Sequence, residues 1–204
     1  MGIRVLIPSG ALGLNYNKEA LKIGLKKKPD IIAIDGGSTD SGPSYLGEGI
    51  SKYSRVSTKV EWKALMEARE KAKIPLLIGT AGTCGTDSAV NWFLDITHEI
   101  AQELNQSLKI VIVRCSQDKS EVLKAYSKGK IQPLPNAPEL SNEVISNCQN
   151  IVALAGVEQI IDAGKSYSVI VLGDSGKGTI NRILAGGVST DVMRLAHNSV
   201  MIIR

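Results

Sequence analysis

Three aspartates stand in loops rich in glycine and hydroxyl side chains, where a carboxylate could bind a ligand or take part in catalysis. Asp35 opens the stretch DGGSTDSGP, Asp40 lies within it, and Asp87 ends the stretch GTAGTCGTD. A carboxylate in such a loop can hold a ribose, coordinate magnesium or act as a general base. The same residue types also form ordinary turns and helix caps. We take the three aspartates as candidate catalytic residues.

Glycines and hydroxyls in the same loops are candidates for binding an anion, because glycine lets backbone amides approach a phosphate without a Cβ in the way. Polar loops follow five of the apolar runs described below, and the ends of parallel strands meet at one edge of a sheet. Five loops at one edge favour a ligand cleft over a set of unrelated turns. The candidate ligand-binding residues in these loops are Ser9, Gly10, Gly36, Gly37, Ser38, Thr39, Gly79, Gly82, Gly173, Gly176 and Gly178.

Short apolar runs that alternate with longer amphipathic stretches must position these loops. This pattern is typical of a parallel sheet covered by helices, and it predicts an α/β, three-layer Rossmann-like sandwich with a mainly parallel sheet of about six strands. We expect Asp87 and Asp118 at helix N-termini. The expected strands are 3–8, 30–35, 74–79, 108–114, 167–173 and 199–204, and the expected helices are 17–27, 59–72, 87–105, 118–128, 141–163 and 179–196.

The composition fits one domain over residues 1–204, since 204 residues with 43% hydrophobic side chains suffice for one well-buried core. Three cysteines without close spacing predict neither a disulfide framework nor a zinc knuckle. The chain begins without the pattern of a signal peptide, and no run approaches the roughly 18 apolar residues of a membrane helix. We therefore expect a cytoplasmic protein with no membrane partner.

The net charge of +4 comes from scattered basic residues and does not indicate a nucleic-acid partner. The one cluster, at residues 26–28, is typical of the basic last turn of a helix that ends before Pro29. With a single phenylalanine in the chain, no pattern of alternating aromatic and basic residues is present. The expected ligand is therefore a small molecule.

Two further motifs are incomplete. Gly10 and Gly13, with Asp35 after them, imitate a dinucleotide fingerprint, but the third glycine of that motif is missing. His98 and the following glutamate begin a zinc-protease motif, but Gln102 stands where the second histidine is needed. We expect no histidine metal centre, whereas magnesium held by aspartate oxygens stays open.

Cys84 precedes an expected helix, where a thiol can become a nucleophile. The sequence offers no evident base for it, because His98 follows fourteen residues later and about four helical turns would separate the two. A buried bystander is the favoured interpretation of this cysteine.

The phrases VLIPSGALG, KPDIIAIDGGSTDSGPSYLGEG, IPLLIGTAGTCGTD and VEQIIDAG carry a resemblance to a known family. Residues 1 to about 165 resemble the N-terminal part of the AtuA-like family, named for acyclic terpene utilisation. The resemblance implies a link to the degradation of branched acyl compounds, as CoA thioesters. In that case Asp35, Asp40 and Asp87 would do acid–base or metal chemistry on an acyl substrate.

Gly173, Gly176 and Gly186 are followed by the closing phrase AHNSVMIIR. Through this spacing and that phrase, residues 169–204 resemble the C-terminus of ATP-binding universal stress proteins, although that family has a serine or threonine where this chain has Gly187. The resemblance implies a phosphate cradle, with ATP or another nucleotide as ligand, and a homodimer paired through the C-terminal strand. The residues that it adds to the ligand-binding candidates are Gly186, Gly187 and Ser189.

Two resemblances that meet near residue 165 imply a hybrid, either recombined in nature or engineered. Three functions therefore stay open: a domain that binds a small molecule or the phosphates of a nucleotide at the carboxyl ends of the strands, the core of a catabolic enzyme acting on branched acyl-CoA compounds, and a scaffold without evolved activity. We favour the first, and so lean against enzymatic activity. The cofactor is open between ATP and another nucleotide, with or without magnesium.

Overall fold

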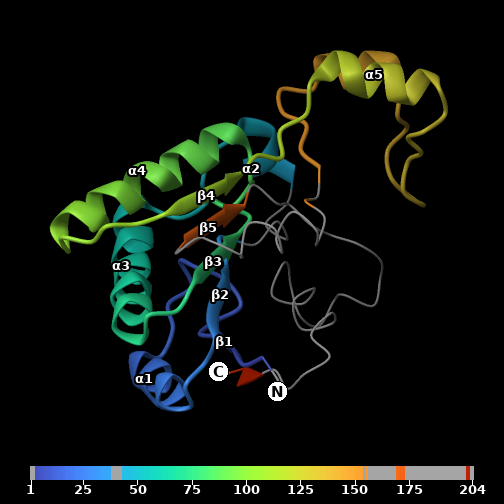
Figure 1. Cartoon of the computed structure of the whole chain (residues 1–204). Coiled ribbons are helices and arrows are strands. Elements are labelled where there is room, and N and C mark those ends of the chain that lie inside the picture. The colour runs from blue at the N-terminus through green and yellow to red at the C-terminus, as the bar shows by residue number, and fades with distance from the viewer. Residues whose placement is uncertain (1–2, 38–42, 154, 156–168, 173–200, 203–204) are drawn as a thin grey trace.

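The computed structural model describes residues 3–37, 43–153, 155, 169–172 and 201–202, and they form a parallel α/β fold (Figure 1). The sheet has the order β4-β5-β3-β2-β1-β6, and each neighbouring pair is parallel. Asp35 of β2 lies opposite Gly79 of β3, so these two strands end level with each other. The strands are β1 Val5–Ile7, β2 Ile31–Asp35, β3 Leu76–Gly79, β4 Ile110–Val113, β5 Val169–Leu172 and β6 Met201–Ile202.

The predicted α/β class with a parallel sheet is confirmed, but the prediction of about six strands holds only in part, because two of the strands are very short. In the described part of the chain, four strands have four or five residues, and β1 and β6 have only three and two. The apolar runs are longer than the strands because their ends enter loops, as at Ile3, which is exposed. β4 is partly exposed because it lies at the edge of the sheet, and Ile112 on it is 40% exposed.

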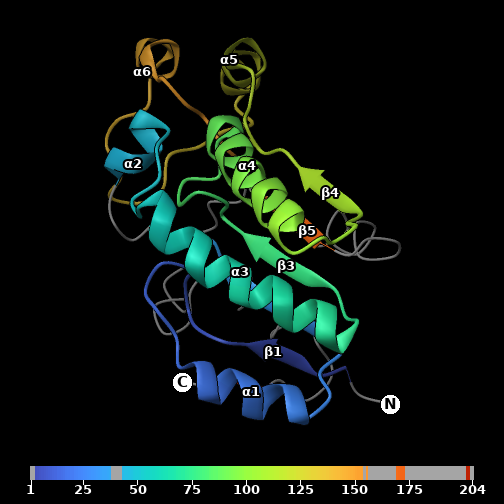
Figure 2. The ribbon, with the colours of Figure 1, turned by 90° about the vertical axis from the view of Figure 1, so that its left-hand side faces the viewer.

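Helices α1, α3 and α4 cover one face of the sheet (Figure 2). Each has an N-cap side chain that accepts backbone N–H bonds in its first turn, and these caps are Asn17, Ser54 and Thr86. The predicted helix over 179–196 lies outside the described residues. The helices are α1 Lys18–Lys26, α2 Pro43–Glu48, α3 Arg55–Ala72, α4 Asp87–Glu103, α5 Lys119–Ser127 and α6 Asn142–Asn147.

Three helix predictions need correction. α3 begins at Arg55 and not at residue 59, because Ser54 caps it and accepts a bond from the Ser57 N–H. α2 was not predicted. The helix expected over 141–163 ends at Asn147, because Cys148 adopts an extended conformation and the chain then runs to an antiparallel bridge between Ser116 and Val152.

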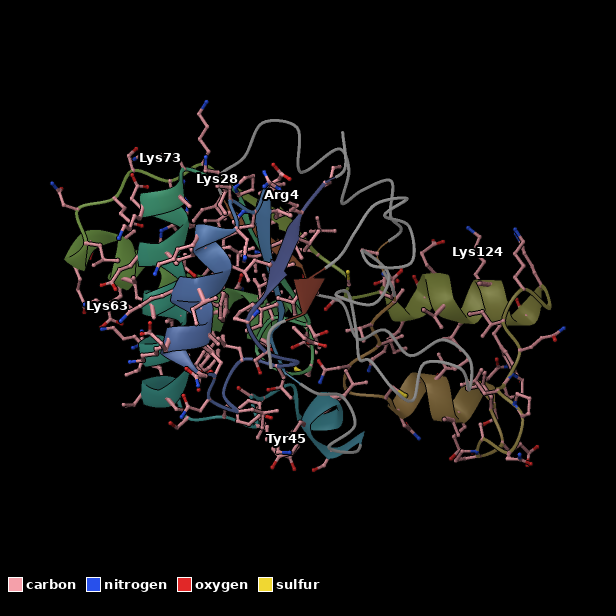
Figure 3. The ribbon with its side chains drawn as sticks, turned by 90° about the horizontal axis from the view of Figure 1, so that it is seen from below. Arg4, Lys28, Tyr45, Lys63, Lys73 and Lys124 are labelled. Carbon is pink, nitrogen blue, oxygen red and sulfur yellow. The ribbon has the colours of Figure 1, made fainter. Side chains whose placement is uncertain are left out.

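Residues 116–152 form what we call the α5–α6 arm, which projects from the body of the domain (Figures 1 and 3). Backbone bonds from Gln117 to Ile151 and from Ala153 to Cys115 tie the base of the arm together. The Asn150 amide donates to the carbonyls of Leu46 and Gly47 on α2, at 3.3 and 2.9 Å. Figure 3 labels Tyr45, which marks the position of α2 between the arm and the α1–α3 side of the domain.

The core lies between the sheet and helices α3 and α4. Leu76 and Ile78 of β3 pack in one cluster with Trp62 of α3 and Phe93 of α4, and all four side chains are fully buried. Their burial fixes the two helices against the strands that carry the loops described next. Among the described residues, no helix has the length and apolar character that crossing a membrane requires.

Candidate functional site

The loops after β1, β2 and β3 pack into one continuous layer at the carboxyl edge of the sheet. The Leu12 N–H, in the loop after β1, donates to the Asp35 carbonyl at 2.7 Å. The Gly36 N–H, just after β2, donates to the Gly79 carbonyl at 2.5 Å. Hydrogen bonds between neighbouring loops therefore hold the layer together without a ligand. We call it the edge layer (residues 8–16, 36–37 and 79–86).

Close approach between loops explains two of its glycines. A Cβ on Gly36 would lie 2.5 Å from the Gly79 carbonyl oxygen. Gly82 has φ +65°, and a Cβ there would lie 2.8 Å from Ala89. Both positions need glycine for packing between backbones, so the residue type alone does not indicate contact with a ligand.

The loop between β3 and α4 is buried along its whole length, from Gly79 to Thr86. Thr80 and Thr83 have positive φ values of 46° and 76°, which non-glycine residues adopt only when their surroundings hold them. Thr83 Oγ1 accepts the Lys52 N–H at 3.1 Å and lies 3.3 Å from Ser51 Oγ. The residues before α3 therefore hold this loop from the outside.

Asp35 is 6% exposed at the end of β2, and one of its carboxylate oxygens accepts the Gly37 N–H at 3.2 Å. The pKa of the Tyr53 hydroxyl is raised by its burial and by the negative charges of Asp35 and Glu61. Asp35, which directly precedes Gly36 of the edge layer, is thus a buried carboxylate whose charge acts on a phenol that stays protonated. This pair is the part of the site best suited to hydrogen bonding or acid–base chemistry.

Glu61 holds the first loop of the edge layer, and the sequence did not reveal it as part of the site. It lies on α3, is buried, and accepts the N–H groups of Gly13 and Asn15 at 2.7 and 3.0 Å. The Tyr16 hydroxyl donates to the Glu61 carbonyl at 2.7 Å, and burial, with Glu61 as the second cause, raises the pKa of Tyr16 above its usual range. The one sequence feature that could have indicated the burial of Glu61 is its place next to Trp62, one position from the apolar stripe of α3.

Asp87 stands apart from Asp35. It lies in the first turn of α4, as predicted, with its carboxylate 3.7 Å from Arg114 and its N–H bonded to Ser116 Oγ at 3.0 Å. The Asp35 carboxylate instead accepts the Gly37 N–H directly after β2. The two aspartates therefore have different described partners, and Asp40 lies outside the described residues.

The other predicted site residues fall into three groups. Ser9 is half-buried and donates to the Ala11 carbonyl, whereas Gly10 is exposed, with no atom within 4 Å of the place of a Cβ. Gly36, Gly37, Gly79 and Gly82 are buried in the edge layer. The residues that lie outside the described part of the chain are Ser38, Thr39, Gly173, Gly176, Gly178, Gly186, Gly187 and Ser189.

Cys84 and His98, the other residues considered for catalysis or metal binding, lie outside the candidate site's chemistry. Cys84 is 1% exposed and lies 3.3 Å from Thr86 Oγ1, in agreement with the prediction of a buried cysteine. His98 is exposed on α4, away from the edge layer. Within the described ranges, no group of three or more histidine, cysteine, aspartate or glutamate side chains is placed to hold a metal ion.

A pocket of about 290 Å³ opens beside the edge layer, between the N-terminal turns of α3 and α4. None of the predicted site residues lines it. It was not foreseen because its walls come from two helices and from residues 49–53, where the quoted motif has ended or is ending. The lining residues are Gly49, Ile50, Ser51, Tyr53, Arg55, Ser88, Ala89 and Trp92.

Fold and site together define a parallel α/β domain whose strand-to-helix loops form a preorganised layer at the carboxyl edge of the sheet, where such domains bind ligands. The model of the universal stress protein family matches residues 75–204, which is 130 of the 204 residues. The chain belongs to the universal stress protein family. No curated protein and no solved structure matches it.

The family match begins at β3, far before the closing segment from residue 169 that carried the resemblance in the sequence. It therefore includes residues 75–165, which we had compared with the AtuA-like family. The comparisons give no support to the AtuA-like resemblance or to a hybrid origin.

Proposed function

We propose that this protein binds a small anionic molecule, in the first place a nucleotide through its phosphates, at the carboxyl edge of the sheet. The observation that carries the proposal is the edge layer, in which hydrogen bonds join the loops after β1, β2 and β3 into one preformed surface. The N-terminus of α4 follows the last of these loops, and a helix N-terminus favours a negative charge. Gly173, Gly176, Gly178, Gly186, Gly187 and Ser189 are proposed as the other wall.

Gly10 offers a sharp test of this site. It is exposed at the edge, and the protein leaves open space where its Cβ would stand. Gly10→Val would therefore leave the fold intact and place two methyl groups where the ligand is expected. Gly47→Val is the matched control, because Gly47 also has open space around it but lies on α2.

The measurement is the melting temperature with ATP, AMP, NAD and CoA, each with and without magnesium. A ligand at about 100 times its Kd stabilises a protein by about 2.7 kcal/mol, which for this size raises Tm by about 5 to 10 °C. We expect that shift for the wild type and for Gly47→Val, and a much smaller one for Gly10→Val. No shift with any ligand would exclude a nucleotide site at this edge and favour a scaffold without evolved activity. An equal shift in all three proteins would mean that the ligand binds away from Gly10.

A catabolic enzyme acting on branched acyl-CoA compounds is the second candidate. Buried Asp35 beside Tyr53 favours it, because a carboxylate and a protonated phenol can serve as base and acid. Turnover of branched acyl-CoA thioesters by the wild type, lost in Asp35→Asn with the fold intact, is the expected result. Unchanged turnover in that variant would remove Asp35 from the mechanism.

Assembly and location complete the proposal. β6 is the last strand in the order of the sheet and pairs with β1, which places it where a second copy could add its own β6 across a two-fold axis. We expect a cytoplasmic homodimer, with a mass in light scattering of twice the 21.8 kDa of one chain. A monomeric mass at micromolar concentration would contradict this pairing.

A further inference from the structure

The pocket between α3 and α4 has the size and the wall composition of a small-molecule site. Its volume of about 290 Å³ lies close to the lower end, roughly 300 Å³, of the range for small-molecule sites. Its wall combines aromatic and aliphatic surface with a few polar groups, which is the usual composition of such sites. It shares no residue with the ligand-binding candidates predicted from the sequence, although Tyr53, on which the charge of Asp35 acts, lines it.

Hydrogen bonds from three directions fix the loop that forms one wall of the pocket. Ser88 Oγ of α4 donates to the Gly49 carbonyl at 3.1 Å. Ser51 Oγ lies 3.3 Å from Thr83 Oγ1 of the edge layer. Asn150 of the arm holds the preceding turn through the Gly47 carbonyl. The pocket is therefore preorganised, which lowers the entropy that a ligand must lose on binding.

Charge at the pocket favours an anion with a single negative charge. Arg55 lines the pocket at the N-terminus of α3 and pairs with Glu99 at 2.7 Å. Lys59 also holds Glu99, so Arg55 can share its guanidinium with a ligand while Glu99 keeps a partner. In this ion-pair ladder three cations face two carboxylates, which leaves one positive charge in excess. The members of the ladder are Arg55, Lys59, Lys63, Glu99 and Glu103.

The rest of the wall favours a flat apolar body on that anion. Trp92, half-buried on α4, and Tyr53 supply aromatic surface, and Ile50 and Ala89 supply aliphatic surface. A guanidinium binds a carboxylate with two parallel hydrogen bonds. We propose that this pocket binds a small aromatic carboxylate, with the carboxylate on Arg55 and the ring against Trp92.

The two tryptophans of the chain make the test specific. Trp62 is fully buried and hydrogen-bonded to Thr97, whereas Trp92 lines the pocket. In a ¹H–¹⁵N spectrum of the indole groups, the Trp92 signal therefore reports on binding and the Trp62 signal serves as the internal reference. Benzoate is the probe, and benzamide is its neutral match in size and shape. Trp92→Phe assigns the two indole signals.

We expect benzoate to shift the Trp92 signal saturably in the millimolar range and to leave the Trp62 signal unmoved. Benzoate should bind at least about tenfold more tightly than benzamide, because a hydrogen bond between two charged groups is stronger than one to a neutral group. Arg55→Gln should weaken benzoate binding at least about tenfold. Lys63→Gln, which removes the same charge two turns further along α3, should change it less than about threefold. An unmoved Trp62 signal in Arg55→Gln confirms that this variant is folded.

Three results would overturn the proposal: equal binding of benzoate and benzamide, equal loss in Arg55→Gln and Lys63→Gln, or no saturable shift of Trp92. The outcome is independent of the nucleotide site, because Gly10→Val leaves every residue of this pocket in place and should bind benzoate as the wild type does. A loss of benzoate binding in Gly10→Val would also contradict a separate pocket.

Discussion

Trp62 of α3 and Phe93 of α4 meet edge to face, with ring centroids 4.8 Å apart and an angle of 63° between the rings. The Trp62 N–H donates to Thr97 Oγ1 at 3.0 Å, and Thr97 in turn donates to the Phe93 carbonyl at 2.9 Å. A ring pair and a short chain of buried hydrogen bonds therefore join the two helices that support the pocket. Aromatic pairs of this geometry add to the free energy that burial alone provides.

Removing the Phe93 ring should strongly destabilise the protein. Phe93→Ala should lower the free energy of unfolding by about 3 to 5 kcal/mol, since it deletes a fully buried side chain and leaves a cavity against Trp62. Val56→Ala on the exposed face of α3 is the control, with an expected change within about 0.5 kcal/mol. Urea unfolding measures both. A similar loss in the two variants would mean that the ring pair is not part of the cooperative core.

Loss of the Glu61 carboxylate should lower the free energy of unfolding. Glu61→Gln replaces one of its two acceptor oxygens with a donor that faces a backbone N–H, at Gly13 or Asn15. We expect a loss of about 1 to 3 kcal/mol in the free energy of unfolding, the cost of a buried group left unsatisfied. Glu67→Gln, at an exposed position on the same helix, should have almost no effect in the same urea experiment. Equal effects would argue against the two bonds to the loop.

A methyl group at Gly36 should disturb the edge layer. Gly36→Ala places a Cβ 2.5 Å from the Gly79 carbonyl oxygen and 2.7 Å from that of Thr80, and neither backbone oxygen can move away freely. A loss of about 1 to 3 kcal/mol is expected from such overpacking. Gly10→Ala, which meets no atom within 4 Å, should stay near wild type. Calorimetry of the two variants measures the difference in Tm. An unchanged Tm for Gly36→Ala would show that the loops can move apart without a loss of stability.

The ion-pair ladder between α3 and α4 should respond to acid. Hydrogen bonds from Lys59 and Lys63 lower the pKa of Glu103 from 4.5 to about 2. Because the folded pKa is below the unfolded one, the contribution to stability is present above pH 4.5 and is lost as the pH falls toward about 2. Glu103→Gln should therefore be less stable than the wild type at pH 6, and the difference should shrink over this window.

Unfolding midpoints in urea, measured from pH 6 to pH 2, test the ladder. Glu19→Gln is the control, because Glu19 forms a single exposed pair with Lys22 on α1. The difference at pH 6 should also shrink in 0.5 M salt, since these groups are open to solvent. A difference that stays constant with pH would assign the effect of the Glu103 substitution to something other than its charge.

Much of the fold could be predicted because the apolar runs that become β2, β3 and β5 are buried in the middle of the sheet, where both faces demand apolar side chains. Asp118 was correctly expected at a helix start, and it caps α5 through bonds from Ser120 and Glu121. These are local signals, in which the residue and its neighbours along the chain contain the information.

The rest depends on contacts between distant segments. α2 escaped prediction because its six residues include a proline and a glycine and carry no clear period. The helix expected over 141–163 stops early because residues 151–153 bond to Cys115 and Gln117. Glu61 belongs to no motif in the sequence, and only the path of the loop after β1 makes it a buried acceptor.

β5 lies between β3 and β4 in space and pairs with both, although it follows both along the chain. A ribosome therefore completes β3, α4, β4 and the whole arm before it makes the strand that connects β3 to β4. Until residue 172 has been synthesised, no strand lies between β3 and β4, and α4 packs on a sheet that still lacks β5. The sheet from β4 to β1 can therefore become continuous only after this strand of four residues has been made, and β6 is added later still.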